Sequence, residues 1–170
     1  MFIRAPVDFS RISSQFAKRR KHPVLGFTRA HKGTDFAAST GTPVRSAGNG
    51  RVIFSGRKGG FGNVVMVRHN GKYTTAYAHL YRISKKIKKN SRVKQGQVIG
   101  QVGMTGTATG PHLHYEIRVN GRQVDPLNIQ LPAANPVPRK YMADFRLKTA
   151  SLLARLNSGT MKLASLTITR

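Results

Sequence analysis

Short hydrophobic runs separated by glycine-rich turns make up the middle of the chain, from about Gly41 to Gly121. The runs "NVVMVRH" and "KYTTAYAHL" are rich in β-branched and aromatic residues, which favour strands. Asn70-Gly71 lies between these two runs, and Asn120-Gly121 follows "HLHYEIRV". An Asn-Gly pair between strands indicates a β-hairpin, because both turn residues need positive φ. The pattern predicts a mainly β fold, an antiparallel glycine-rich sheet or sandwich.

The hydrophobic pattern changes after the proline-rich stretch "VDPLNIQLPAANPVPRK". Apolar side chains then recur at helical spacing: Met142, Phe145, Leu152, Leu153 and Leu156. We therefore expect one amphipathic helix, from about Lys140 to Leu156, that packs on the β domain or on a partner. In this interpretation residues 1–131 form one domain, and residues 132–170 form a proline-rich linker, a helix and a tail.

The charge of the chain is strongly unbalanced. It has 30 Lys and Arg against 5 Asp and Glu, a formal net charge of +25. Such a charge implies a polyanionic partner, which can be nucleic acid, an anionic membrane or an acidic cell-wall polymer. The basic runs "KRRKH" (18–22) and "KKIKKNSRVK" (85–94) are predicted to be surface loops.

Targeting signals are not evident. No apolar run is long enough for a transmembrane segment. The opening "MFIRAPVDF" lacks the apolar core of an export signal. Either the protein stays inside the cell, or this chain begins after an export signal.

Composition also narrows the chemistry. Cysteine is absent, which excludes disulfides, thiolate metal ligands and cysteine nucleophiles. Glu116 is the only glutamate, so a metal site of the HExxH type, which needs a glutamate between its histidines, is excluded.

Two histidine motifs suggest a metal site. "HKGTD" places His31 and Asp35 four residues apart, and "GPHLHYE" places His112, His114 and Glu116 two apart. On a strand, residues two apart lie on one face. Imidazole and carboxylate groups together suit zinc, and three protein ligands leave a fourth position for water. Taken alone, the second motif equally fits the polar face of an ordinary strand.

A further histidine, His79, lies in "YAHLY". On its own it fits a half-buried strand histidine. However, "HKGTD", "YAHL" and "GPHLHYE", in this order and with glycine-rich strands between them, resemble the lysostaphin/LytM-type zinc metallopeptidases. The resemblance covers residues 3–131. The opening "FIRAPVDFSRISSQF" and the helix after "LPAANP" are most similar to the Gram-negative murein DD-endopeptidases.

The resemblance implies a role for each site residue. His31, Asp35 and His114 would be the ligands of one Zn²⁺ ion. His112 and His79 would lie beside the metal without binding it. Because no glutamate of the HExxH kind is available, proton transfer needs another group that titrates near neutrality, and we expect His112, helped by His79, to take the proton from the attacking water. Glu116 would orient an imidazole from behind, although a simple surface or strand-pairing carboxylate explains it equally well.

The resemblance also implies a function, a zinc-dependent endopeptidase that hydrolyses peptide cross-links in bacterial peptidoglycan. The protein would then act in the cell envelope, in the periplasm of a Gram-negative cell, with anionic envelope polymers as further partners and no nucleic acid. The motifs do not separate cleavage of D-alanyl–meso-diaminopimelate bridges from cleavage of glycine bridges. Two alternatives are a catalytically weak wall-binding regulator of the same fold and a basic nucleic-acid-binding β domain.

Overall fold

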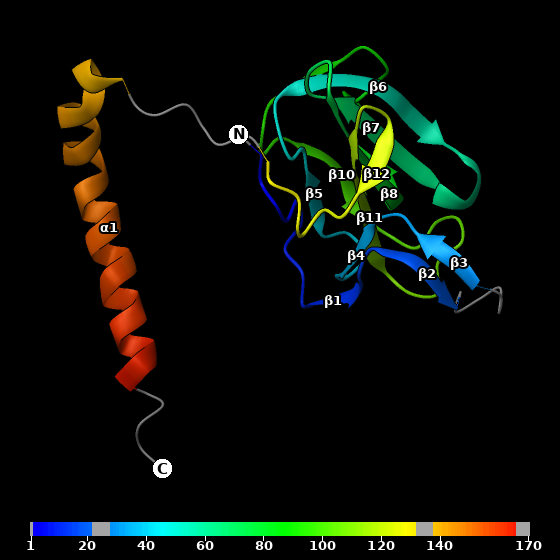
Figure 1. Cartoon of the computed structure of the whole chain (residues 1–170), viewed down its shortest axis with the longest axis horizontal. Coiled ribbons are helices and arrows are strands. Elements are labelled where there is room, and N and C mark those ends of the chain that lie inside the picture. Colours follow the sequence, from blue (N-terminus) through cyan, green and yellow to red (C-terminus); the bar gives the residue numbers. More distant parts are fainter. Residues whose placement is uncertain (1, 22–27, 132–137, 166–170) are drawn as a thin grey trace. The chain divides into compact units, whose positions relative to one another are not determined.

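The computed structural model describes residues 2–21, 28–131 and 138–165. The chain divides into two compact units, Met1–Pro132 and Ala133–Arg170 (Figure 1). The first unit contains all the described strands, and the second contains the described α-helix.

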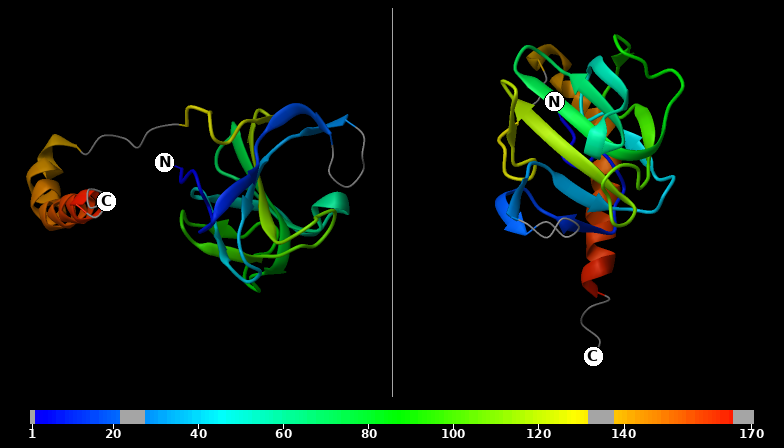
Figure 2. Two further views of the ribbon diagram at one scale, coloured as in Figure 1. Left: turned by 90° about the horizontal axis from the view of Figure 1, so that it is seen from below. Right: turned by 90° about the vertical axis from the view of Figure 1, so that its right-hand side faces the viewer.

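The described strands of the first unit are almost all joined into one antiparallel sheet. They are β1 (Arg11–Ser14), β2 (Ala17–Lys21), β3 (Thr28–His31), β4 (Thr34–Ala37), β5 (Pro43–Arg45), β6 (Gly50–Arg57), β7 (Asn63–Arg68), β8 (Tyr73–Ile83), β9 (Arg92–Val93), β10 (Val98–Val102), β11 (His112–Val119) and β12 (Arg122–Val124). The sheet runs β1-β4-β11-β8-β7-β6-β9, with β10, β5 and β12 paired beside this path. Strands β2 and β3 form a separate two-stranded sheet. The large sheet is strongly curved and twisted (Figure 2), and the predicted antiparallel, mainly β fold is confirmed.

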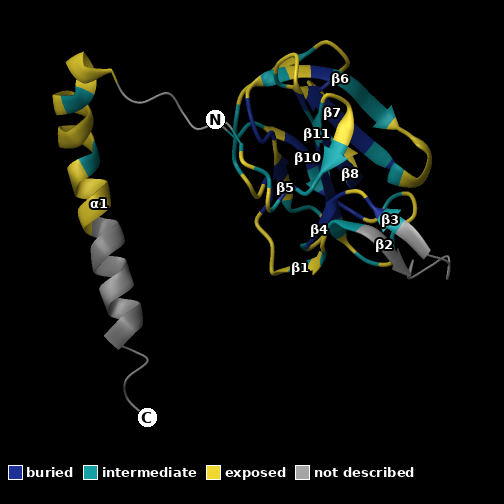
Figure 3. Ribbon diagram, in the orientation of Figure 1, coloured by how far each residue is buried: buried dark blue, intermediate teal, exposed yellow. Residues whose placement is uncertain are grey.

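One face of the large sheet covers the main hydrophobic core. On β11 the side chains of Leu113, Tyr115 and Ile117 are fully buried in this core. Their neighbours His112, His114 and Glu116 therefore face the opposite side, as the two-residue period of a strand requires. Burial is concentrated in the central strands, whereas many residues of the connecting loops and of the short strands β1 and β12 are exposed or only partly buried (Figure 3).

The opposite face carries a second, smaller apolar cluster. Val64, Met66, Ala76 and Ala78 from β7 and β8 form it. Ala76 pairs directly with Glu116 across the sheet, so this cluster and the polar side chains of β11 share one face. One face of the sheet thus serves packing, and the other is available for chemistry.

The two predicted Asn-Gly hairpins form, but with different turns. Asn120 and Gly121 both have positive φ, 49° and 79°, as expected. Asn70 is not among the positive-φ residues. Its side-chain oxygen instead accepts hydrogen bonds from the backbone N–H groups of Lys72 and Tyr73, at 2.9 and 2.8 Å. Asparagine can close a turn in this way without a left-handed backbone.

The prediction of a loop for the basic run at residues 18–22 is wrong for its first four residues. Residues 18–21 belong to β2, which pairs with β3. Backbone hydrogen bonds make a strand ladder, so apolar side chains are not required. His22 lies outside the described residues.

The second unit contains the predicted helix. The helix α1 (Met142–Ser165) follows a 3₁₀ turn, η2 (Arg139–Tyr141). It extends beyond the predicted end at Leu156, and the sequence "MKLA" at 161–164 consists of strong helix formers. Phe145, Leu152 and Leu153 are exposed. Within the described part of the chain, no helix combines the length and the apolar character that a membrane crossing needs.

Candidate metal centre

Three side chains that the sequence singles out converge at one point. His31 ends β3, Asp35 lies on β4, and His114 lies on β11, directly opposite Asp35. One ligand atom from each lies within 4.8 Å of the others. A bend at Gly33 separates the end of β3 from the start of β4, so His31 and Asp35 lie on two successive strands and not on one continuous strand.

Gly33 allows this bend to lie close to β11. A Cβ atom at this position would be 2.6 Å from Cε1 of His114 and 2.7 Å from the carbonyl oxygen of Tyr115. Both distances are shorter than side-chain contacts allow. The His114 ring can therefore occupy its position only because residue 33 has no side chain.

We expect Gly33→Ala to displace the His114 ring and to weaken metal binding by about 10- to 100-fold, the range seen when groups that position metal ligands are lost. Competition with a chromophoric chelator measures the change. Gly71→Ala is the matched control, because a Cβ atom there meets nothing within 4 Å. Equal metal affinity in the two variants would contradict the prediction.

The spacing of the three ligand atoms suits a small cation. Nε2 of His31 lies 3.0 Å from Oδ1 of Asp35 and 3.2 Å from Nδ1 of His114. Nδ1 of His114 lies 2.7 Å from the same Asp35 oxygen. Ligands about 2.0–2.2 Å from a tetrahedral ion stand roughly 3.3 Å apart. The observed triangle is slightly smaller, and a short outward movement would accommodate an ion at its centre.

The outer nitrogen of each ligand imidazole is held by an acceptor. Nδ1–H of His31 donates to the carbonyl oxygen of Gln15 over 2.8 Å. Nε2–H of His114 donates to Oε1 of Glu116 over 3.3 Å. These partners fix the rings and direct the other nitrogen, Nε2 of His31 and Nδ1 of His114, towards Asp35. Such outer hydrogen bonds are typical of metal-binding histidines.

The electrostatics of the centre favour a positive charge. Burial alone would lower the pKa of His114, but hydrogen bonds to Asp35 and Glu116 raise it to about 9. Burial alone would raise the pKa of Asp35, but hydrogen bonds from His114 and His31 hold that pKa well below its usual range. The buried carboxylates of Asp35 and Glu116 thus stabilise a positive charge at this point. A divalent cation bound by the same side chains would supply that charge. The residues present fit a metal ion.

Glu116 is a buried partner of His114 and not a surface carboxylate. It is 2% exposed, and its Oε2 atom accepts hydrogen bonds from Nε and a terminal nitrogen of Arg118 at 2.9 and 2.6 Å. Burial alone would raise the pKa of Glu116, but the hydrogen bonds with His114 and Arg118 lower it. The sequence motif did not include Arg118. Its parity on β11, the same as that of His114 and Glu116, is the signal that could have found it.

His112 and His79 lie beside the three converging side chains. Nδ1–H of His112 donates to the carbonyl oxygen of Gly110 over 2.8 Å, and Nδ1–H of His79 donates to that of Thr105 over 2.7 Å. When the single N–H of a neutral imidazole is on Nδ1, its Nε2 atom carries a lone pair. Nε2 of His112 lies 3.8 Å from Oδ1 of Asp35. The ring centroids of His79 and His112 are 4.7 Å apart.

The backbone of His79 is unusual for a strand residue. Its φ is 60°, in the left-handed region that residues other than glycine rarely adopt. Such strain costs about 1–2 kcal/mol and is concentrated at functional sites. Burial is the main reason that the pKa of His79 falls to about 4, so the ring is neutral at pH 7. The remaining described histidine, His69, contacts Asn49 and Thr75 and lies outside this group.

Two glycine-rich loops meet next to His79. The carbonyl oxygen of Gly60 accepts a hydrogen bond from the N–H of Thr107 over 2.9 Å. A Cβ atom on Gly62 would be 2.4 Å from Thr105, and one on Gly106 would be 2.4 Å from Gly60. These glycines therefore allow close contact between the loops, one of which supplies the acceptor for His79.

A curved antiparallel sheet that brings two histidines and an aspartate to metal-binding distance is the arrangement of a metallopeptidase domain. Residues 29–126 match the model of Peptidase family M23, and the chain belongs to this family. The predicted relationship to the lysostaphin/LytM-type metallopeptidases and to Gram-negative murein DD-endopeptidases is thereby confirmed.

Named relatives support the same assignment. The chain is 48% identical over 144 residues to "Peptidoglycan DD-endopeptidase ShyC" of Vibrio cholerae, an alignment that covers 85% of this chain and 33% of the relative. A crystal structure of a zinc-containing peptidase from Vibrio cholerae superposes with a TM-score of 0.71 at 46% identity, covering 77% of this chain and 40% of that one. The catalytic domain of lysostaphin from Staphylococcus simulans gives a TM-score of 0.62 at 31% identity, covering 69% and 89%. The chain thus spans about a third of the length of the curated relative.

Proposed function

We propose that this chain is the catalytic domain of a zinc-dependent endopeptidase that hydrolyses peptide cross-links in bacterial peptidoglycan. The observation that carries the proposal is the convergence of His31, Asp35 and His114, with the Nε2 atoms of His112 and His79 beside them. The named activity of the relative ShyC and the zinc-containing peptidase from Vibrio cholerae support the substrate and the metal. Two imidazoles and one carboxylate suit zinc among the common metals.

The ligand residues would hold the metal by the nitrogen and oxygen atoms that face one another. When bound, zinc supplies Lewis-acid activation of water and of the peptide carbonyl group. Gln15 and Glu116 orient the two ligand imidazoles through their outer nitrogens. Arg118 holds Glu116 in place through two hydrogen bonds. The ligands are thus set before the metal binds, which limits reorganisation during the reaction.

His112 is assigned as the general base. Its Nδ1–H is committed to a carbonyl oxygen, so Nε2 is free to accept a proton, and this atom lies 3.8 Å from Oδ1 of Asp35. The oxygen of water bonds to the carbonyl carbon of the cross-link while its proton passes to Nε2 of His112. The C–N bond then breaks, and His112 returns the proton to the amine nitrogen. His79, with its free Nε2 atom next to His112, orients the attacking water as a hydrogen-bond acceptor.

The site of action follows from this substrate. We place the protein in the cell envelope, in the periplasm of a Gram-negative cell. Its charge of +25 would concentrate it on anionic envelope polymers, and that attraction weakens as salt screens it.

Digestion of purified sacculi tests the proposal. The zinc-loaded chain is expected to convert cross-linked muropeptide dimers to monomers, each cleavage adding one water, as read by mass spectrometry. Removal of zinc by a chelator should abolish the conversion, and added zinc should restore it. Unchanged dimers with the zinc-loaded chain would refute hydrolysis and favour a wall-binding regulator. Salt-sensitive binding to nucleic acid without bound metal would favour the nucleic-acid interpretation.

A further inference from the structure

Three arginines form a row across one end of the large sheet. Arg68 on β7 lies directly opposite Arg51 on β6, and Arg51 lies directly opposite Arg92 on β9. Directly opposed residues of antiparallel strands project to the same face, with Cβ atoms about 4.5–5.5 Å apart. Arg51, Arg68 and Arg92 are all exposed, and together they are called the arginine row below.

The arginine row has no acidic counterpart within the described part of the chain. The ion pairs found there use Asp35, Glu116 and Asp144, and none of them involves the row. Like charges directly opposite one another destabilise a sheet. With 5 acidic residues in the whole chain and none of them paired with the row, the arginine row is open to an anion from outside.

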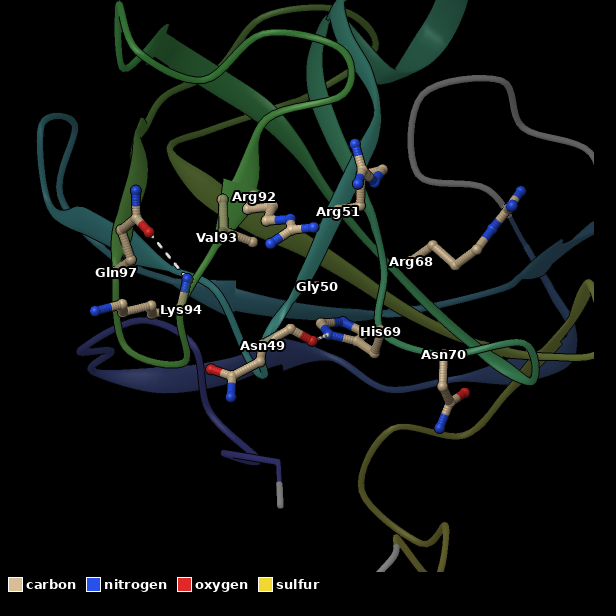
Figure 4. A pocket seen from close by; sticks show the side chains of 10 residues that line it. All are labelled: Asn49, Gly50, Arg51, Arg68, His69, Asn70, Arg92, Val93, Lys94 and Gln97. Carbon is tan, nitrogen blue, oxygen red and sulfur yellow. Dashed lines mark hydrogen bonds between the residues drawn. The ribbon is translucent and has the colours of Figure 1, made fainter.

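The arginine row lines a pocket with a volume of about 670 Å³. Lys94, Asn49 and Asn70 line the same pocket, and Figure 4 shows these side chains around it. Lys94 is exposed and follows Arg92 by two residues. Guanidinium groups bind carboxylates and phosphates in a bidentate manner, and the lysine and asparagine side chains add further donors. The pocket therefore suits anionic oxygens.

The arginine row lies on the same face of the sheet as the candidate metal centre. Arg68 pairs directly with Thr74 on β8, and Thr74 pairs directly with Arg118 on β11. Arg118 shares its face with His114, four residues earlier on the same strand. With strands about 4.8 Å apart and a rise of about 3.3 Å per residue, the row lies roughly 15–25 Å from His114.

A ligand that contacts both places at this separation must be a polymer, because a single peptide bond is too short to span it. An extended peptide covers about 3.3–3.6 Å per residue, so roughly four to eight residues span the distance. The smaller apolar cluster, including Met66 and Ala76, lies between the two places on the same face. A ligand that bears repeated carboxylates can therefore occupy the metal centre and the arginine row together.

We propose that the arginine row is a second binding site for the substrate polymer, where it binds free carboxylates of peptides next to the cross-link being cleaved. This inference rests on the proposed function, and it adds a position that the histidine motifs do not contain. The shared sheet face favours peptidoglycan carboxylates over a phosphate-bearing surface, because one bound polymer then reaches both places.

The test compares two double variants that lose the same charge. Arg51→Gln with Arg92→Gln removes two members of the row, and Lys86→Gln with Lys89→Gln removes two exposed lysines that do not line the pocket. Binding to purified sacculi is measured by co-sedimentation at fixed ionic strength. We expect the arginine variant to bind roughly 5- to 30-fold more weakly, as two exposed charge-assisted contacts allow. The lysine variant should remain within about two-fold of the wild type.

Hydrolysis of a soluble muropeptide dimer separates this inference from the proposed function. The arginine variant should cleave the dimer at the wild-type rate and cleave sacculi more slowly. If the wild type cleaves neither substrate, the proposed function fails, while selective loss of sacculus binding in the arginine variant still supports the row. Equal binding by the arginine variant and the wild type, or an equal loss in both double variants, would overturn the inference. A loss confined to phosphatidylglycerol vesicles, with sacculus binding kept, would assign the row to phosphates and also overturn it.

Discussion

His114→Ala is expected to remove bound zinc and to lower kcat/KM for cross-link cleavage by on the order of 10⁴-fold or more, since activation of water by the metal contributes several kcal/mol. His114 supplies one of three converging ligand atoms, and its ring also links Asp35 to Glu116. Metal content by elemental analysis and muropeptide release by mass spectrometry measure the two effects.

His69→Ala is the matched control for this variant. His69 is also a hydrogen-bonded histidine of the same unit, but its contacts are with Asn49 and Thr75. It should keep its metal and cleave a soluble cross-linked dimer at the wild-type rate. The dimer is used here because His69 lines the pocket of the arginine row. Because loss of a buried residue can unfold the domain, His114→Ala is also compared with the metal-stripped wild type by circular dichroism. Similar spectra, with activity restored by zinc in the wild type alone, would support the ligand role, whereas full activity in His114→Ala would refute it.

The strand pattern of β11 could be predicted from the sequence because it is local. The alternation from His112 to Val119 separates a chemical face from a packing face, and the structure confirms it through the complete burial of Leu113, Tyr115 and Ile117. The resemblance added the association of His31 with His114, which are 83 residues apart. The residue pattern within each motif could not predict that contact, because the contact joins two distant segments of the chain.

What the sequence did not predict depends on contacts between distant segments. The acceptors for His31 and His79 are backbone carbonyl oxygens of Gln15 and Thr105, and any residue type offers such a group. The pairing of Arg51 with Arg68 and Arg92 depends on the register between strands. Arg92 lies in a run that the charge pattern described only as a basic surface loop, because net charge carries no information about which residues face one another.

The hydrogen bonds of Glu116 with His114 and Arg118 indicate which role the only glutamate has at the candidate metal centre. In sites of the HExxH type the glutamate acts as the general base. Here Glu116 hydrogen-bonds to the outer nitrogen of His114, and Arg118 occupies its other oxygen. Both oxygens of Glu116 are thus engaged, and we propose that a histidine carries out the proton transfer. This division makes the role of His112 the most informative one to test.

His112→Ala is expected to keep zinc bound and to lower kcat by about 10²- to 10⁴-fold, the usual contribution of a general acid–base group. Its Nε2 atom lies 3.8 Å from Asp35 Oδ1, close to the ligands but outside the group of three ligand atoms. Loss of a proton acceptor that acts in the transition state should reduce kcat and kcat/KM together and leave KM little changed. Steady-state kinetics on a soluble cross-linked dimer, with metal content measured in the same preparation, would show this combination.

A comparison with His79→Ala then separates the base from its neighbour. Both rings donate Nδ1–H to a carbonyl oxygen, so either substitution removes a similar group and a similar hydrogen bond. Added imidazole should restore part of the activity of His112→Ala, because a small base can occupy the space of the missing ring, and should restore less in His79→Ala. Unchanged kcat in His112→Ala, or rescue by imidazole in His79→Ala alone, would transfer the role of base from His112 to His79.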